Sequence, residues 1–222
     1  MDDAITPKRF SEGEGVGDWR IVGDGACTFV PTRSFEEAVR LVQAIGQLAG
    51  IDRHRPDVDI RHDGVTIRLI TIAEDYYGLS DRDVELARAI SVAARDLGLS
   101  PDPDPVQSVL VIPGATDTSS VMPFWQAALG YVRRGDTPDE DLIDPHGRGP
   151  SFWFEQMKEP RPGGGGAIHI AVWVPAEHAQ ARVAAVLAAG GRMVRDEFAP
   201  AWWTLADAAG NEADIASITG RD

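Results

Sequence analysis

The stretch LGLSPDPDPV, residues 97–106, divides the chain into two parts. Its alternating prolines remove backbone donors and hold the chain extended, so neither a helix nor an inner strand can continue through them. Segments with regular apolar periodicity lie on both sides of this stretch. We therefore predict two domains, residues 1–98 and 106–222, joined by a proline-rich linker at 99–105.

The composition is that of a globular protein. Of the 222 residues, 43% are hydrophobic, which is enough to build two cores without disulfides. The formal net charge of -14 argues against a nucleic-acid partner, because affinity for a phosphate backbone depends largely on Lys and Arg. Small molecules or proteins are the better candidates.

The sequence predicts a cytoplasmic protein without a membrane partner. No apolar run approaches the roughly 20 residues that a membrane helix needs, and the start MDDAITPKRF has no apolar signal core. Cys27 is the single cysteine, which excludes an internal disulfide and a thiolate-cluster metal site.

The first part has the element order β-β-α-β-β-α. SFEEAVRLVQAIGQLAG at 34–50 predicts an amphipathic helix that begins with a capping box of Ser34 and Glu37. Residues 65–71 alternate as a half-buried strand, and a second helix follows at 80–98. This order predicts an α+β domain, an antiparallel sheet with two helices on one face.

The second part contains a weak internal repeat. A strand at 106–113, a helix and further strands are followed by the same order from 167 onwards, and RPGGGG at 161–166 connects the two copies. Offsets of 59 to 62 residues relate Gln107 to His169, Gly130 to Gly190, and Glu155 to Asp214. A near-constant offset is typical of duplication, so we predict a paired βαβββ domain.

The first part resembles the pterin-4a-carbinolamine dehydratase family over nearly all of residues 10–95. The resemblance depends on FVPTRSFEEAV, RHRPDVDI, VTIRLIT and above all GLSDRDVELA. In that family two adjacent histidines before a proline, and a third at the end of the next strand, remove water from a hydroxylated pterin. Imidazoles suit this reaction because they act as base and as acid near pH 7.

Two of those three imidazoles are absent from this chain. His54 matches the first, but Arg55 and Ile72 stand at the other two positions, and arginine cannot act as a base at physiological pH. His62 could supply a displaced imidazole, and Asp83 could contact a ligand or only stabilise the start of its helix. We expect His54, Arg55, His62 and Asp83 to form a site that binds a planar ligand with a weakened proton relay. A solvated, charged turn is the open alternative.

The second part resembles the vicinal oxygen chelate superfamily, in particular its glyoxalase-like and bleomycin-resistance-like members, over residues 106–218. The repeat and the late segment DAAGNEADI support the resemblance. It implies that the first and last strands of each unit supply one metal ligand apiece, which would be Gln107, Glu155, His169 and Asp214. Such donors suit divalent Zn, Ni, Co, Mn or Fe. The alternative is a trough that binds an apolar ligand without metal.

The two resemblances together imply a small-molecule lyase of the 4a-hydroxytetrahydrobiopterin dehydratase type. Its activity should be weak or altered, and it is fused to a glyoxalase-like domain that binds a metal or a ligand. The alternative is a non-catalytic protein that sequesters a small molecule, as bleomycin-resistance-like proteins do. We expect a homo-oligomer in either case, for which the first domain could serve as the assembly module.

Overall fold

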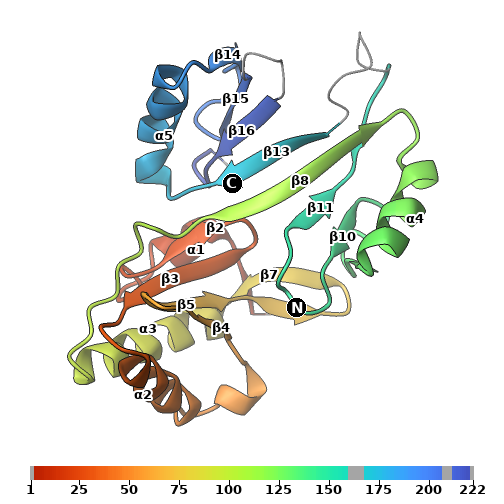
Figure 1. Ribbon diagram of the computed structural model, residues 1–222. Helices are drawn as coiled ribbons and strands as arrows, with labels where there is room; N and C mark the ends of the chain where they lie inside the picture. Colours follow the sequence, from red (N-terminus) through yellow and green to blue (C-terminus); the bar gives the residue numbers. More distant parts are fainter. Residues whose placement is uncertain (1–2, 160–167, 207–211, 221–222) are drawn as a thin grey trace. The chain divides into compact units, whose positions relative to one another are not determined.

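A computed structural model of the chain describes residues 3–159, 168–206 and 212–220 (Figure 1). The chain forms two compact units, Met1–Val106 and Gln107–Arg221. The predicted RPGGGG connection lies outside the described residues. Within the described part of the chain, no helix is long and apolar enough to cross a membrane.

The first unit is an α+β layer built on antiparallel strands. A four-stranded sheet has the order β2-β3-β5-β4, and a three-stranded sheet has the order β1-β7-β6. Its helices are α1 (Pro7–Ser11), α2 (Phe35–Gly46), the 3-10 turn η1 (Ile51–Arg53) and α3 (Asp81–Asp96). Its strands are β1 (Ala4–Ile5), β2 (Arg20–Val22), β3 (Gly25–Pro31), β4 (Asp57–Ile60), β5 (Gly64–Leu69), β6 (Thr71–Ala73) and β7 (Tyr76–Ser80).

The core of the first unit lies between its sheet and the helices α2 and α3, which lie together on one side (Figure 1). The alternation predicted for β5 is confirmed, because Val65, Ile67 and Leu69 are fully buried. Leu41 and Ile45 of α2 are buried as well. The predicted antiparallel sheet with two helices on one face is therefore confirmed.

The start of α2 differs in detail from the prediction. Ser34 accepts a hydrogen bond from the amide of Glu37 at 3.2 Å, which is half of a capping box. The carboxylate of Glu37 does not return to Ser34, because it accepts from the backbone and guanidinium of Arg33. The helix ends at Gly46, and Gly50, with φ of 82°, precedes η1.

The second unit is one curved sheet with the strand order β14-β15-β16-β13-β8-β11-β10-β9, with β12 also paired to β8. The first copy of the repeat contains β8 (Ser108–Ala115), α4 (Thr118–Leu129), β9 (Val132–Arg133), β10 (Asp141–Ile143), β11 (Ser151–Trp153) and β12 (Glu155–Gln156). The second copy contains β13 (Ile168–Trp173), α5 (Ala176–Ala188), β14 (Arg192–Arg195), β15 (Trp202–Ala206) and β16 (Glu212–Ala216).

The two copies meet through their first strands. β8 pairs with β13 antiparallel, and each first strand pairs on its other side with the last strand of its own copy, in parallel. Val172, Leu205 and Ile215 pack with α5, while Phe152 and Leu142 pack with α4 residues, so both helices cover the same face of the sheet. The predicted duplication is therefore visible in the strand order. His169, Ile112 and Asp214 lie on the opposite face, which is here named the trough face.

The predicted linker is attached to the first unit. The amide of Asp102 donates to the carbonyl of Phe29 in β3 at 2.7 Å. Leu99 and Val106, at the two ends of the linker, are buried. The linker therefore contacts β3 through Asp102. The limits of the two predicted domains remain a prediction.

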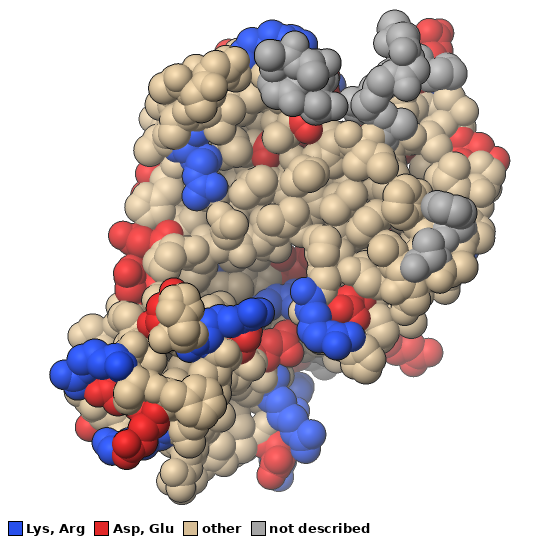
Figure 2. Space-filling model, in the orientation of Figure 1, with Lys and Arg blue, Asp and Glu red and all other residues tan. Residues whose placement is uncertain are grey.

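The acidic net charge is not gathered into one patch on the visible face of the molecule. Figure 2 shows basic and acidic side chains lying side by side there. Ion pairs join opposite charges in the described residues, for example Arg9 with Asp81 and Arg33 with Glu37. Exposed pairs of this kind contribute little to stability.

Candidate functional sites

His54 is placed by a short turn after α2. Gly50 adopts a left-handed conformation that favours glycine, η1 follows, and the extended backbone of His54 leads into β4. The side chain of His54 is 14% exposed and lies against Asp83, which is fully buried. Asp83 occupies the third position of α3, where its carboxylate completes a capping box with Ser80.

Asp83 is the centre of a buried hydrogen-bond network. One carboxylate oxygen, Oδ1, lies 2.6 Å from Nε2 of His54. The other, Oδ2, accepts from the hydroxyl of Thr71 and from the amide of Ser80, both at 2.7 Å, and from the hydroxyl of Ser80 at 3.1 Å. The hydroxyls of Thr71 and Ser80 also lie 2.7 Å apart. Asp83 therefore does more than stabilise the start of its helix.

The network keeps Asp83 ionised. Burial alone would raise its pKa, but hydrogen bonds from His54, Thr71 and Ser80 together hold the pKa below its ordinary value. An ionised carboxylate only accepts hydrogen bonds, so Nε2 of His54 must be the donor. In the neutral imidazole, Nδ1 is then the nitrogen with a lone pair.

The other residues predicted for this site are not brought to His54. The side chain of Arg55 is exposed and pairs with Asp52 at 3.4 Å. His62 lies in the turn between β4 and β5 with its side chain 94% exposed. Ile72 of β6 is exposed too. The structure thus gathers His54 and Asp83 and leaves Arg55 and His62 apart.

The second unit contains a second buried histidine and aspartate pair. Nε2 of His169 in β13 lies 3.4 Å from Oδ2 of Asp214 in β16, and both side chains are almost fully buried. The hydroxyl of Thr204 in β15 donates to Oδ1 of Asp214 at 2.6 Å. Thr204, Asp214 and His169 share one face of the sheet by register, because the next residues along β15 and β16, Leu205 and Ile215, point to the opposite face and pack with α5.

The strand register identifies the counterpart of this pair in the first copy. Asp214 pairs with Ala171, two residues after His169. Glu155 pairs with Gly114, two residues after Ile112. Ile112 is itself paired with His169 across β8 and β13, so it lies at the position equivalent to His169. The first copy therefore has a buried isoleucine where the second has its imidazole.

Gln107 does not join the other predicted metal ligands. It precedes Ile112 by five residues, about 17 Å of extended chain at roughly 3.3 to 3.4 Å per residue. Its amide oxygen instead accepts from Arg182 at 3.4 Å. Glu155 does share the trough face with His169 and Asp214. It pairs with Gly114, and Gly114 lies on the same face of β8 as Ile112, two residues earlier.

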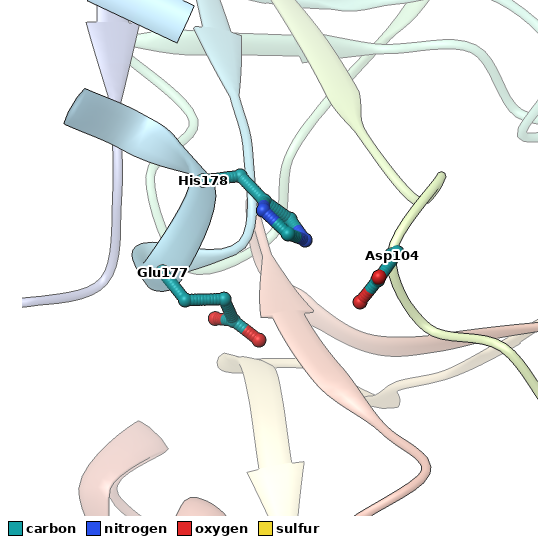
Figure 3. Close-up of side chains that lie close together, drawn as sticks. All are labelled: Asp104, Glu177 and His178. Atoms are coloured by element: carbon teal, nitrogen blue, oxygen red, sulfur yellow. The ribbon is translucent and has the colours of Figure 1, made fainter. Parts of the chain in front are cut away.

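The remaining candidates for metal binding in the second unit are weaker. Figure 3 draws Glu177 and His178, at the start of α5, together with Asp104. Asp104 belongs to Met1–Val106, so only the two residues on α5 belong to the second unit. Two donors are fewer than the three protein ligands of an open catalytic zinc site.

Comparisons with known proteins agree with this division of the chain. A family model described as "Pterin 4 alpha carbinolamine dehydratase" matches residues 5–93, and one described as "Glyoxalase-like domain" matches residues 109–216. An α+β dehydratase-like unit is thus fused to a paired βαβββ glyoxalase-like unit.

Curated relatives match the first unit. A protein of Nocardia farcinica named "Putative pterin-4-alpha-carbinolamine dehydratase" is 40% identical over 35% of this chain and 80% of its own length. A protein of Thermomicrobium roseum with the same name is 32% identical over 42% of this chain and 96% of its own length. The chain therefore belongs to the pterin-4a-carbinolamine dehydratase family through its first unit.

A solved structure resembles part of the chain. It is a glyoxalase/bleomycin resistance protein/dioxygenase superfamily member from Vibrio splendidus 12B01, 16% identical, with a TM-score of 0.33. The match covers 50% of this chain and 99% of that protein.

Sequence reasoning missed three residues that matter at these sites. Thr71 and Thr204 each hold a buried aspartate, and Ile112 fills a position that the repeat assigned to Gln107. The alternation of β5 and its continuation could have pointed to Thr71 as a buried polar residue at a strand end. No local pattern points to Thr204 or Ile112, because their roles depend on register between distant strands.

Proposed function

We propose that the first unit is a lyase that removes water from a hydroxylated tetrahydropterin, with His54 as its proton-transfer group. The observation that carries this proposal is the 2.6 Å contact between His54 and the buried carboxylate of Asp83. A buried carboxylate orients an imidazole and stabilises the imidazolium that forms during proton transfer. A histidine on a solvated turn would need no such partner.

The reaction itself fits a site with one imidazole. The N–H bond next to the hydroxyl-bearing carbon breaks, its electron pair forms a C=N bond, and the hydroxyl leaves as water once it is protonated. His54 is the group that removes the proton. Because Arg55 and Ile72 replace the other family histidines, we propose turnover below that of a three-histidine relative, since each acid or base group contributes about 10²- to 10⁴-fold.

The test is turnover of 4a-hydroxytetrahydropterin by the full chain and by a His54→Gln variant, each compared with the uncatalysed reaction. The variant should lose the acceleration, and His62→Gln, in the exposed turn, serves as the matched control. Turnover that survives in His54→Gln contradicts the proposal. Binding of the pterin without any turnover by the unmodified chain would favour the sequestering alternative.

We further propose that the trough of the second unit binds a divalent metal through Glu155, His169 and Asp214. A separation of 3.4 Å between His169 and Asp214 suits two ligands of one ion at bond lengths of about 2.0 to 2.2 Å, and Thr204 is the outer hydrogen bond that ligating carboxylates usually have. Within the described residues, Glu155 is not within 4.8 Å of both partners. Its side chain would have to turn over Ile112 to complete the set.

The bound ion would supply Lewis-acid polarisation of a ligand oxygen. Calorimetric titration with Mn²⁺ or Zn²⁺ tests the site. If no ion binds, the trough becomes a site for an apolar ligand, which is the observation that would favour the bleomycin-resistance-like alternative. The predicted homo-oligomer and the cytoplasmic location remain parts of the proposal, and light scattering and cell fractionation test them.

A further inference from the structure

His54 has one nitrogen available for chemistry. Its Nε2 donates to Asp83, and among the described residues no side chain hydrogen-bonds its Nδ1. Arg55 and His62 are exposed and turn to Asp52 and Asp63. Among the predicted site residues, all of which the structure describes, Nδ1 of His54 is therefore the atom that can both accept and donate a proton.

We propose that both proton transfers of the dehydration pass through Nδ1 of His54, on one face of the ligand. This inference rests on the proposed lyase function and goes beyond it, since it replaces a separate acid and base by one atom. Nδ1 takes the proton from the ligand nitrogen, and the C=N bond begins to form. The same Nδ1–H then protonates the neighbouring hydroxyl as its C–O bond breaks, so water leaves and the neutral imidazole is restored.

The geometry suits this use of one atom twice. The nitrogen proton and the hydroxyl of a carbinolamine are on adjacent atoms, so a ring nitrogen poised above that bond can reach both. Between the two transfers the imidazole is a cation, and the ionised carboxylate of Asp83 at 2.6 Å stabilises it. No second titratable group is required at the ligand.

Thr71 and Ser80 are positioning residues for this atom. Thr71 donates to Oδ2 of Asp83, and the hydroxyl of Ser80 lies 2.7 Å from that of Thr71 and 3.1 Å from the same Oδ2, which leaves Oδ1 aimed at His54. These hydroxyls hold the carboxylate in place, and the carboxylate fixes the tautomer of the imidazole. Neither hydroxyl needs to touch the ligand.

Two measurements on the full chain test the proposal. The first is the ¹⁵N NMR spectrum of the His54 ring, in which Nε2 should carry the proton and Nδ1 should be unprotonated in the neutral state. The second is the pH dependence of kcat/KM, which should show one limb falling towards acid, because a single neutral group starts the reaction. Separate acid and base groups would give a bell-shaped dependence of kcat/KM on pH.

Substitutions at Thr71 separate positioning from structure. Thr71→Val should lower kcat about tenfold, the effect of one hydrogen bond to a charged group, with little change in KM. Thr71→Ser should restore kcat because it restores the hydroxyl. Thr66→Val, on neighbouring strand β5, is the matched control and should change neither constant.

The outcomes distinguish the two levels of the claim. No turnover by the unmodified chain overturns the lyase function itself. Turnover with a proton on Nδ1 in the neutral ring, or with a bell-shaped profile, leaves the lyase function standing and overturns the single-atom proposal. A Thr71→Ser variant as slow as Thr71→Val overturns the role of the hydroxyl chain.

Discussion

The two units each bury one histidine against one aspartate, and the two pairs are built differently. In the first unit the nitrogen and oxygen lie 2.6 Å apart, and the aspartate also accepts from Thr71 and Ser80. In the second unit the pair lies 3.4 Å apart, and Thr204 holds the far oxygen of the aspartate. The first is a closed hydrogen bond that fixes a proton, whereas the second leaves a separation that suits a shared ion.

The comparison teaches that the hydrogen bonds around the same two side chains differ according to the element that carries the aspartate. Asp83 lies in the first turn of α3, where it accepts from a backbone amide and from two hydroxyls. Asp214 lies inside a strand, where the backbone groups are used by the sheet and one side-chain donor remains. Helix starts favour carboxylates, because the first backbone amides of a helix have no partner within the helix.

The largest expected difference between the pairs is in metal binding. His169→Ala should weaken binding of Mn²⁺ or Zn²⁺ by about 100-fold or more, because it removes one of three protein donors. His54→Ala should leave the affinity unchanged, since His54 belongs to the first unit and is not one of the three proposed donors. Isothermal titration calorimetry measures both, with His146→Ala in an exposed loop as control. Equal losses in the two variants would contradict the distinction between the pairs.

The second largest difference is in stability. Asp83→Ala should destabilise the first unit by about 3 kcal/mol, because it leaves a buried network without its acceptor. Asp214→Ala should cost the second unit about 1 to 2 kcal/mol, since it leaves chiefly one hydroxyl unpaired.

Urea denaturation followed by ¹⁹F NMR of fluorotryptophan resolves the two units, because Trp19 reports the first and Trp203 the second. The control is Asp96→Ala, at the exposed end of α3. If Asp214→Ala lowers the free energy of unfolding more than Asp83→Ala does, the second pair is a structural ion pair. The proposal that it binds a metal is then wrong.

A smaller effect is expected from restoring symmetry to the trough. Ile112→His places an imidazole at the position equivalent to His169 and should strengthen Zn²⁺ binding about tenfold, or about 1.4 kcal/mol. Ser108→His, on the same strand and face but four residues away, should change nothing. Gln107→Ala should also leave the affinity unchanged. A loss of affinity in Gln107→Ala would show that Gln107 belongs to the site after all.

The smallest expected effect is the loss of stability of the first unit at low pH. The pKa of Asp83 is lowered in the folded state, so its stabilisation is complete above its unfolded pKa of about 3.9 and is lost as pH falls through the lower folded value. The urea midpoint of the first unit should therefore drop more steeply between about pH 5 and pH 2 than that of Asp83→Asn. Parallel curves would show that the network does not hold Asp83 ionised.

Much of the fold could be predicted because it is encoded locally. The alternation of β5, the capped start of α3 and the repeated order of the second unit all depend on residues close together in the chain. His54 and Asp83 were both named as candidate site residues from a resemblance, without a contact between them. Their hydrogen bond depends on the packing of a turn against a helix 29 residues away.

The rest could not be predicted because register is not a local property. The repeat aligned Gln107 with His169 by residue type, whereas the pairing of β8 with β13 places Ile112 opposite His169. A polar residue near a strand is an attractive candidate in a sequence, but only the backbone hydrogen bonds of the partner strand decide which residue is its equivalent. Arg55 and His62 were grouped with His54 from the family resemblance, whereas the structure exposes Arg55 before β4 and His62 in the turn after it.

The attachment of the linker to β3 has a consequence for hydrogen exchange. Between residues 101 and 105 three positions are prolines without an amide, so Asp102 and Asp104 carry the exchangeable backbone protons of this stretch. The amide of Asp102 donates to Phe29 at 2.7 Å, so its proton should exchange only when that contact opens. The proline-rich segment was predicted to be a linker, yet its Asp102 amide should then exchange as slowly as an amide of the neighbouring sheet.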